Sequence, residues 1–255
     1  MAKSIAVAGK GGTGKTTISA LLISALLQMK KGPVLAVDAD PDSNLGSLLG
    51  VQAQQSIGDL REEVLKEMKN LPAGMTKANY VEAGLHQLIE EADGFDLITM
   101  GKGEGAGCYC SLNNIIRKFS GDLTPSYPWV VIDNEAGLEH ISRRTTSDID
   151  ALLIVVTENP LSLQSAKAIE DITQYLDSRI RKQYLITNMV RDERLEAIQK
   201  RLEGMKAEYL CNIPFDEQLD EHIFNGEPVL DITDSPIMDT MKQILAKIGG
   251  NHGNT

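Results

Sequence analysis

Residues 9–17, GKGGTGKTT, have the composition and spacing of a phosphate-binding loop. Two glycines separated by four residues are followed by lysine and threonine, which is the P-loop pattern. Such glycines let successive backbone N–H groups surround phosphate oxygens, the lysine reaches the β- and γ-phosphates, and the threonine hydroxyl binds Mg²⁺. A glycine-rich turn without nucleotide is the alternative. We expect ATP or ADP with Mg²⁺ here, bound by Gly9, Lys10, Gly11, Gly12, Thr13, Gly14, Lys15, Thr16 and Thr17.

Three aspartates supply carboxylates that could act at the Mg²⁺ or at the γ-phosphate of the nucleotide. Asp38 and Asp40 occupy alternate positions at the end of VDAD, and Asp133 ends the apolar stretch WVVIDN. Asp133 is at the position of a Walker B aspartate, which holds Mg²⁺ through water, and Asp38 could assist it. A turn in which these side chains only cap backbone N–H groups is the alternative for Asp38 and Asp40.

Cys108 and Cys110 lie one residue apart in the glycine-rich segment GEGAGCYCSLNN, residues 103–114. In an extended segment, residues two apart face the same side, so both thiolates can bind one ion. Two thiolates are half the ligand set of a four-coordinate Zn²⁺ or Ni²⁺, and a two-fold related copy of the chain would supply the other half. Incidental buried cysteines and a redox pair are the alternatives. The isolated Cys211 reads as a small buried side chain.

The elements that position these residues follow from an alternation of short β-prone apolar segments with helical patterns. Several segments are apolar on both faces, as in a buried parallel sheet. The alternation predicts an α/β fold, a doubly wound, mostly parallel sheet flanked by helices. Strands are expected at 4–9, 34–40, 95–101, 129–134, 151–157, 184–189 and 207–214. Helices are expected at 16–31, 57–70, 111–119, 162–179 and 193–204.

The unusual polar residues follow the strands, where open α/β sheets bind their ligands. No internal repeat or composition break divides the chain, so we expect one P-loop ATPase domain over residues 1–247. Residues 248–255 are polar and glycine-rich at their end, and we expect them to form a disordered tail.

The charge and the composition limit the kinds of partner and the cellular compartment that we expect. The formal net charge of −11 argues against general binding to nucleic acid or to an anionic membrane. The N-terminus lacks the pattern of a secretory signal, and the apolar stretches are shorter than a bilayer span. We expect a cytoplasmic protein, in which a close cysteine pair favours metal or redox chemistry over a structural disulfide.

A second lysine early in the loop, Lys10 in KGGTGKT, resembles the deviant Walker A ATPases, the family of MinD, ParA and the nitrogenase iron protein. The resemblance implies a homodimer that encloses two nucleotides, with Lys10 reaching the phosphates of the partner's ATP. It implies that Asp40 positions the attacking water. It also implies that Asn188 in LITNMV reads adenine and that Pro214 in CNIPFDEQ lies in the loop over the base.

GCYC with Asn113 and Arg117, together with DNEAGLEHISRRT at 133–145, is similar to the CooC-type accessory ATPases. That family inserts nickel into carbon monoxide dehydrogenase. The resemblance implies Ni²⁺, or Zn²⁺ in vitro, held across a dimer by Cys108 and Cys110 and delivered with ATP hydrolysis. A related type, AcsF, serves acetyl-CoA synthase, and the sequence leaves both clients open. A positioning switch of the MinD or ParA kind is the main alternative, and an iron–sulfur carrier, which uses Cys-x-x-Cys, is another.

Overall fold

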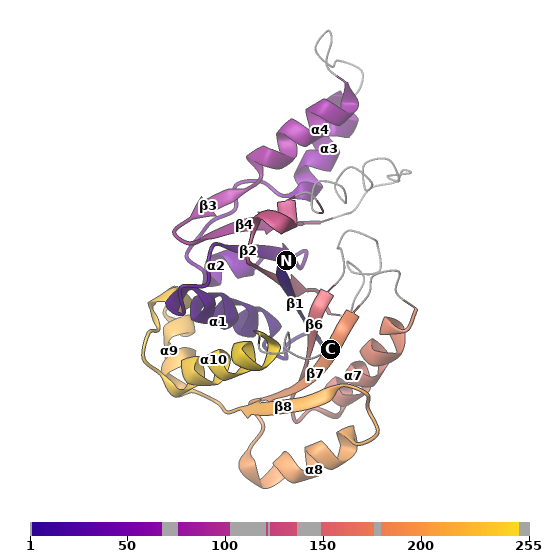
Figure 1. The fold of residues 1–255 in the computed structure, drawn as a ribbon, viewed down its shortest axis with the longest axis vertical. Coiled ribbons are helices and arrows are strands. Elements are labelled where there is room, and N and C mark those ends of the chain that lie inside the picture. The colour runs from indigo at the N-terminus through magenta and orange to yellow at the C-terminus, as the bar shows by residue number, and fades with distance from the viewer. Residues whose placement is uncertain are drawn as a thin grey trace.

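The computed structural model describes residues 2–67, 76–102, 121, 123–136, 149–175 and 180–249. Their core is an eight-stranded sheet in the order β3-β4-β2-β5-β1-β6-β7-β8 (Figure 1). All neighbouring strands are parallel except the short edge pair β3 and β4, so the expected doubly wound α/β sheet is confirmed. The strands are β1 (Lys3–Gly9), β2 (Val34–Ala39), β3 (Glu90–Ala92), β4 (Phe95–Thr99), β5 (Trp129–Asn134), β6 (Ile149–Val156), β7 (Ile180–Asn188) and β8 (Glu208–Ile213).

Helices cover both faces of the sheet because its central strands are apolar on both sides. One core is formed with α1 (Lys15–Gln28), α2 (Leu45–Leu48), α9 (Glu217–Phe224) and α10 (Pro236–Gly249). The opposite core is formed with α3 (Ile57–Glu67), α4 (Lys77–Gln87), α7 (Pro160–Thr173) and α8 (Asp192–Leu202). Short 3₁₀ turns lie at Thr124–Ser126 and Val229–Asp231. In Figure 1, α3 and α4 extend beyond the β3–β4 edge, while α1, α9 and α10 lie together.

The C-terminal boundary differs from the expectation. Helix α10 continues to Gly249, and Ile248 is buried in the core, so the folded domain extends past residue 247. The Lys3 ammonium donates a 2.6 Å hydrogen bond to the carbonyl of Gly249, which joins the last turn to the start of β1. Helix α10 as a whole was not among the helices expected from the sequence. The expected disorder of residues 250–255 lies outside the described residues.

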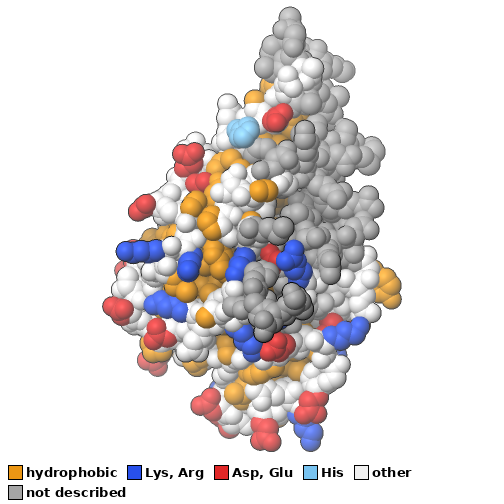
Figure 2. Space-filling model, viewed as in Figure 1, with side chains coloured by type: hydrophobic (Ala, Val, Ile, Leu, Met, Phe, Trp, Pro, Cys, Tyr) orange, Lys and Arg blue, Asp and Glu red, His pale blue; other side chains and the backbone are white. Residues whose placement is uncertain are grey.

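The surface carries both signs of charge. On the face in Figure 2, Asp and Glu side chains lie among Lys and Arg side chains, and hydrophobic side chains gather over α1. Among the helices of the described ranges, none has both the length and the apolar character needed to cross a membrane.

Candidate functional site

The phosphate loop joins the central strand β1 to α1, and its glycines are required by its geometry. Gly14 has φ 87° and begins α1 as its N-cap, a left-handed conformation that favours glycine. A Cβ on Gly9 would lie 2.7 Å from the carbonyl of Val155 and 2.9 Å from the Thr13 hydroxyl. The loop is therefore pressed against β6, with the N-terminal end of α1 directed at the space where an anion would bind.

The side chain of Lys15 lies near the backbone carbonyl group of Lys10. Lys15 is 6% exposed, and its ammonium lies 3.5 Å from the carbonyl oxygen of Lys10. The Thr13 hydroxyl donates to the same oxygen at 2.8 Å. Lys10 itself is half-buried. The loop thus holds Lys15 inside the fold, where its charge is screened less than at the surface.

Asp133 ends β5 and is fully buried. Ser19, one turn into α1, donates to its Oδ1 at 3.1 Å, while Oδ2 has no hydrogen-bond partner among the described residues. Burial raises the pKa of Asp133 to about 6, against the opposing effects of the Thr16 and Ser19 hydroxyls and the Lys15 charge. Mg²⁺ binds to oxygen ligands, and the Oδ2 of Asp133, left unpartnered by the described residues, and the nearby Thr16 hydroxyl are oxygens of this kind.

Asp38 lies beside Asp133 on the neighbouring strand β2, and the two are register partners. Its carboxylate accepts hydrogen bonds from the backbone N–H of Leu45 at 2.9 Å and of Asp40 at 3.2 Å. Burial raises the pKa of Asp38 to about 7, the two backbone bonds lower it, and the charge of Asp133 raises it further. A cation between the two strands would relieve this repulsion.

Asp40 is half-buried and follows the last residue of β2. Its Oδ1 accepts a 3.0 Å hydrogen bond from the N–H of Asp42, and its carbonyl accepts one from Ser43. The capping that was the alternative for these aspartates is therefore present. It does not exclude a role at the nucleotide, since the side chain lies close enough to Asp133 to raise that residue's pKa.

Asn188 ends β7 and reaches the phosphate loop. Its Nδ2 donates to the carbonyl oxygen of Thr13 at 2.9 Å, and a Cβ on Gly14 would lie 2.4 Å from the same Nδ2. The amide group therefore fastens the loop. Adenine reading by Asn188 stays a prediction.

The edge next to Asn188 exposes apolar side chains. Pro214 follows β8 and is exposed, and Phe215 beside it is 57% exposed. Met189, at φ 54°, donates its N–H to the carbonyl of Ile213 at 2.8 Å and is 43% exposed. Small-molecule sites in proteins combine apolar side chains with a few placed polar groups, as this edge does.

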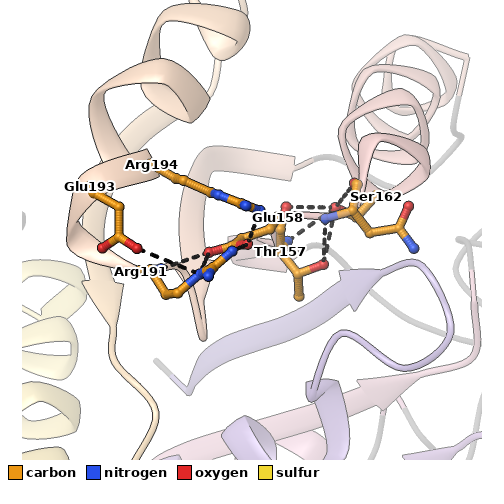
Figure 3. A network of polar contacts seen from close by, with 7 residues as sticks. Thr157, Glu158, Ser162, Arg191, Glu193 and Arg194 are labelled. Atoms are coloured by element: carbon orange, nitrogen blue, oxygen red, sulfur yellow. Dashed lines mark hydrogen bonds and ion pairs between the residues drawn. The ribbon is translucent and has the colours of Figure 1, made fainter.

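An ion-pair cluster lies at the same edge of the sheet, after β6 and β7 (Figure 3). Glu158 accepts hydrogen bonds from the N–H, Nε and Nη2 of Arg191 and from Nη1 of Arg194, all between 2.7 and 3.0 Å. These bonds, first of all those from the Arg191 side chain, lower the pKa of Glu158 to about 2. The cluster ties the loop after Asn188 to the end of β6.

The fold thus brings the phosphate loop, Asp38, Asp40, Asp133 and Asn188 to one edge. Sequence reasoning missed Ser19, although it lies three residues after Thr16 on the same helix face. It also missed Asn134, which donates to the carbonyl of Val7 and whose Oδ1 is buried without a partner in the described ranges. No local spacing pointed to Asn134.

The cysteine motif is not part of this described geometry. Cys108, Cys110, Asn113, Arg117 and most of the segment after Asp133 lie outside the described residues. Within the described ranges, no group of three or more His, Cys, Asp or Glu side chains could hold a metal ion. Cys211 is half-buried in β8, and burial raises the pKa of its thiol to about 11, which suits an unreactive side chain.

Residues 4–229 match the family model of the CobQ/CobB/MinD/ParA nucleotide binding domain. The chain belongs to this family. It is 38% identical to the uncharacterized ATP-binding protein MJ0685 of Methanocaldococcus jannaschii, over 96% of this chain and 97% of that one. It is 34% identical to the carbon monoxide dehydrogenase accessory protein CooC of Rhodospirillum rubrum, over 68% of this chain and 69% of that one.

Solved structures agree with the fold of this family. MinD of Aquifex aeolicus covers 99% of each chain at a TM-score of 0.71 and 22% identity. MinD of Pyrococcus horikoshii, which was solved with Mg-ADP, has a TM-score of 0.67 and 19% identity over 99% of this chain and 98% of that one. The protein is thus an ATP-binding P-loop ATPase of the MinD/ParA type. In it, Thr16 and Asp133 would hold Mg²⁺, which neutralises developing phosphate charge when bound.

Proposed function

We propose that this ATPase is a nickel metallochaperone, in which Cys108 and Cys110 of two subunits bind one ion and ATP hydrolysis drives its delivery. The observation that carries the proposal is the place of the Cys-x-Cys pair in the chain. The pair follows strand β4 in the sequence, and the carboxyl end of β4 lies at the same edge of the sheet as the nucleotide site. Lys102 is the last described residue of the short connection between β4 and the pair. The similarity to CooC supports the same function. Carbon monoxide dehydrogenase is the proposed client, with acetyl-CoA synthase as its alternative.

The proposed catalytic roles follow the site. Lys15 would bind the β- and γ-phosphates, Asp40 would position the attacking water, and Lys10 would act on the nucleotide of the partner subunit. Hydrolysis would then depend on dimerisation, and a shared metal ion would favour the dimer because half of its ligands come from each copy. A reducing cytoplasm would keep both thiols available.

Nickel titration tests the metal function, read by equilibrium dialysis with metal analysis and by the thiolate charge-transfer absorption of bound Ni²⁺. We expect about one Ni²⁺ per two chains, as the shared site requires, with dimerisation followed by light scattering. Cys108→Ser and Cys110→Ser should each abolish binding, whereas Cys211→Ser, the matched control in β8, should leave it unchanged. Binding that survives both substitutions would overturn the proposal. Nickel transfer to apo carbon monoxide dehydrogenase and to apo acetyl-CoA synthase would then identify the client.

A MinD- or ParA-like positioning switch is the second candidate, favoured by the similarity of the fold. MinD of Bacillus subtilis is 23% identical over 88% of this chain and 80% of that one. One structural observation weighs against membrane attachment through α10. Its apolar side chains, including Met241, Ile244 and Ile248, are buried in the core and are not available to a lipid surface. ATP-dependent sedimentation with anionic liposomes or with DNA would support this second function.

A further inference from the structure

The segment that leads into the cysteine motif is hydrogen-bonded to the nucleotide site. Met100 donates its N–H to the carbonyl of Asp38 at 2.8 Å, and its own carbonyl accepts the N–H of Gly58 at 2.9 Å. Lys102 precedes Cys108 by six residues. Hydrogen bonds therefore join Asp38 to Met100, and Met100 to the start of α3, in the segment that precedes the cysteine motif in the sequence.

Two glycines bring α3 into direct contact with this segment. A Cβ on Gly58 would lie 2.2 Å from the carbonyl oxygen of Lys102, which is backbone and cannot rotate away. A Cβ on Gly101, at φ 64°, would lie 2.1 Å from the hydroxyl oxygen of Ser56. At both positions the packing leaves no room for a side chain. Residues 100–102 are thus held between β2 and the first turn of α3.

The first turn of α3 is itself well fixed. The Ser56 hydroxyl donates to Asp59 Oδ2 at 2.6 Å, and the Ser56 N–H donates to the same oxygen at 2.9 Å. The Asp59 N–H returns a bond to the Ser56 hydroxyl at 3.2 Å. This reciprocal cap anchors the end of the helix that contacts the segment.

Asp38 also holds the loop that contains Asp40. Its carboxylate accepts the N–H groups of Asp40 and Leu45, while its carbonyl accepts Met100. The loops after β2 and β4 face a common pocket of about 530 Å³, lined by Pro41, Ser43, Ser56, Thr99 and Lys102 among others. A shift of the loop that contains Asp40 can therefore reach residues 100–102 through Asp38. The pocket leaves space for that shift.

We infer that Gly58 and Gly101 are positioning residues that transmit the nucleotide state from Asp38 to the metal-binding cysteines. The inference rests on the proposed metal function. The close packing of α3 against residues 100–102 makes the segment move as a unit with Asp38, so nucleotide binding changes metal affinity. By thermodynamic linkage, metal binding changes nucleotide affinity by the same factor.

The test compares Gly58→Ala, which pushes on the Lys102 carbonyl, with the matched control Gly84→Ala. The three atoms nearest to a Cβ on Gly84 all belong to the Leu60 side chain and none to residues 100–102, so this control disturbs the packing of α4 against α3. Nickel affinity is measured with ADP and with a non-hydrolysable ATP analogue, and the basal ATPase rate is recorded. The wild type and Gly84→Ala should show a nucleotide effect of at least about tenfold, and Gly58→Ala less than about twofold.

Ser56→Ala is the second variant, for the case that Gly58→Ala does not fold. It adds no atoms and removes the hydroxyl that lies against Gly101 and caps α3, so we expect it also to reduce the nucleotide effect. Coupling that is unchanged in the folded variants would overturn the inference, as would equal loss in Gly84→Ala. Cysteine-dependent nickel binding in the wild type without any nucleotide effect would overturn it too. Nickel binding that does not need Cys108 and Cys110 would instead overturn the proposed function.

Discussion

Asp38 and Asp133 are direct register partners on neighbouring strands β2 and β5, and both side chains are fully buried at the nucleotide edge of the sheet. Two carboxylates in this arrangement are costly without a cation, because burial and mutual repulsion both favour their protonated forms. The fold therefore places two mutually repelling carboxyl groups at the proposed Mg²⁺ site. Removing one of the two charges measures that repulsion.

Asp133→Asn should stabilise the nucleotide-free and Mg²⁺-free protein at pH 8. Because the folded-state pKa values of about 7 for Asp38 and about 6 for Asp133 exceed their ordinary value of 3.8, these groups favour the folded state most below pH 4. That contribution is lost as the pH rises through about 6 to 7. Thermal unfolding at pH 5 and pH 8 should show a variant stabilised at pH 8 by about 2 kcal/mol, with a flatter pH dependence.

The exposed Asp93 provides the control for this experiment, since Asp93→Asn should leave the pH dependence as it is in the wild type. Adding Mg-ADP should stabilise the wild type and not Asp133→Asn, because the cation needs the ionised carboxylate. Equal pH dependence in wild type and variant would show that Asp133 is not strained.

Lys15→Ala and Lys10→Ala should lose ATP hydrolysis by at least about a hundredfold, for different reasons. In the proposed mechanism Lys15 binds the nucleotide of its own subunit, so its loss should also abolish nucleotide binding, whereas Lys10→Ala should still bind ATP. Mixing the two inactive variants should restore part of the activity. The Lys15→Ala subunit would supply Lys10 to ATP bound by the other. Lack of recovery in mixed dimers would contradict action of Lys10 in trans. Lys31→Ala, at an exposed lysine, is the control for the loss of one positive charge.

Asn188→Ala should weaken ADP and GDP binding alike, by about five- to tenfold, because the lost bond fastens the carbonyl of Thr13 in the phosphate loop. Isothermal titration with both nucleotides measures this, and Asn225→Ala at an exposed asparagine serves as the control. A loss confined to ADP would instead support adenine reading by Asn188.

Glu158→Gln should lower thermal stability slightly, because Arg191 and Arg194 are half-exposed and exposed ion pairs contribute little. The lowered pKa of Glu158 means that its contribution is present above pH 4.5 and lost only as the pH falls through about 2. The difference from wild type should therefore be constant between pH 6 and pH 8 and shrink in 1 M salt. Glu62→Gln, in the exposed pair with Lys66, should have a still smaller effect.

A chain ended after Gly249 should be as stable as the full chain, whereas one ended after Lys247 should lose about 1 to 3 kcal/mol. Ile248 is only 8% exposed and packs in the core, and Lys3 donates a hydrogen bond to the carbonyl of Gly249. The shorter chain loses both contacts. Denaturant unfolding of the two truncated chains measures the difference. Equal stability would place the domain boundary back at residue 247.

Local patterns in the sequence determined the P-loop, the buried parallel strands and the strand-end positions of Asp38, Asp133 and Asn188. These could be predicted because glycine spacing and two-sided apolar segments are properties of neighbouring residues in the chain. The antiparallel edge strand β3 and helices α2, α4 and α9 were not predicted, because their sequences are short or mixed and tertiary packing decides them. Helix α10, Pro236–Gly249, was not predicted either, and its contacts with the core show that it belongs to the folded domain.

The tertiary structure alone decided which polar groups meet. Asp38 and Asp133 are far apart in the sequence and become neighbours through the β2–β5 register, and burial in the fold raises the pKa values of both. Asn188 reaches Thr13, and Met100 joins Asp38 to the segment before the cysteines, through pairings that no local spacing encodes. The Cys-x-Cys motif comes from the sequence alone, because the carboxyl edge of the sheet locates a site but does not determine its ligands.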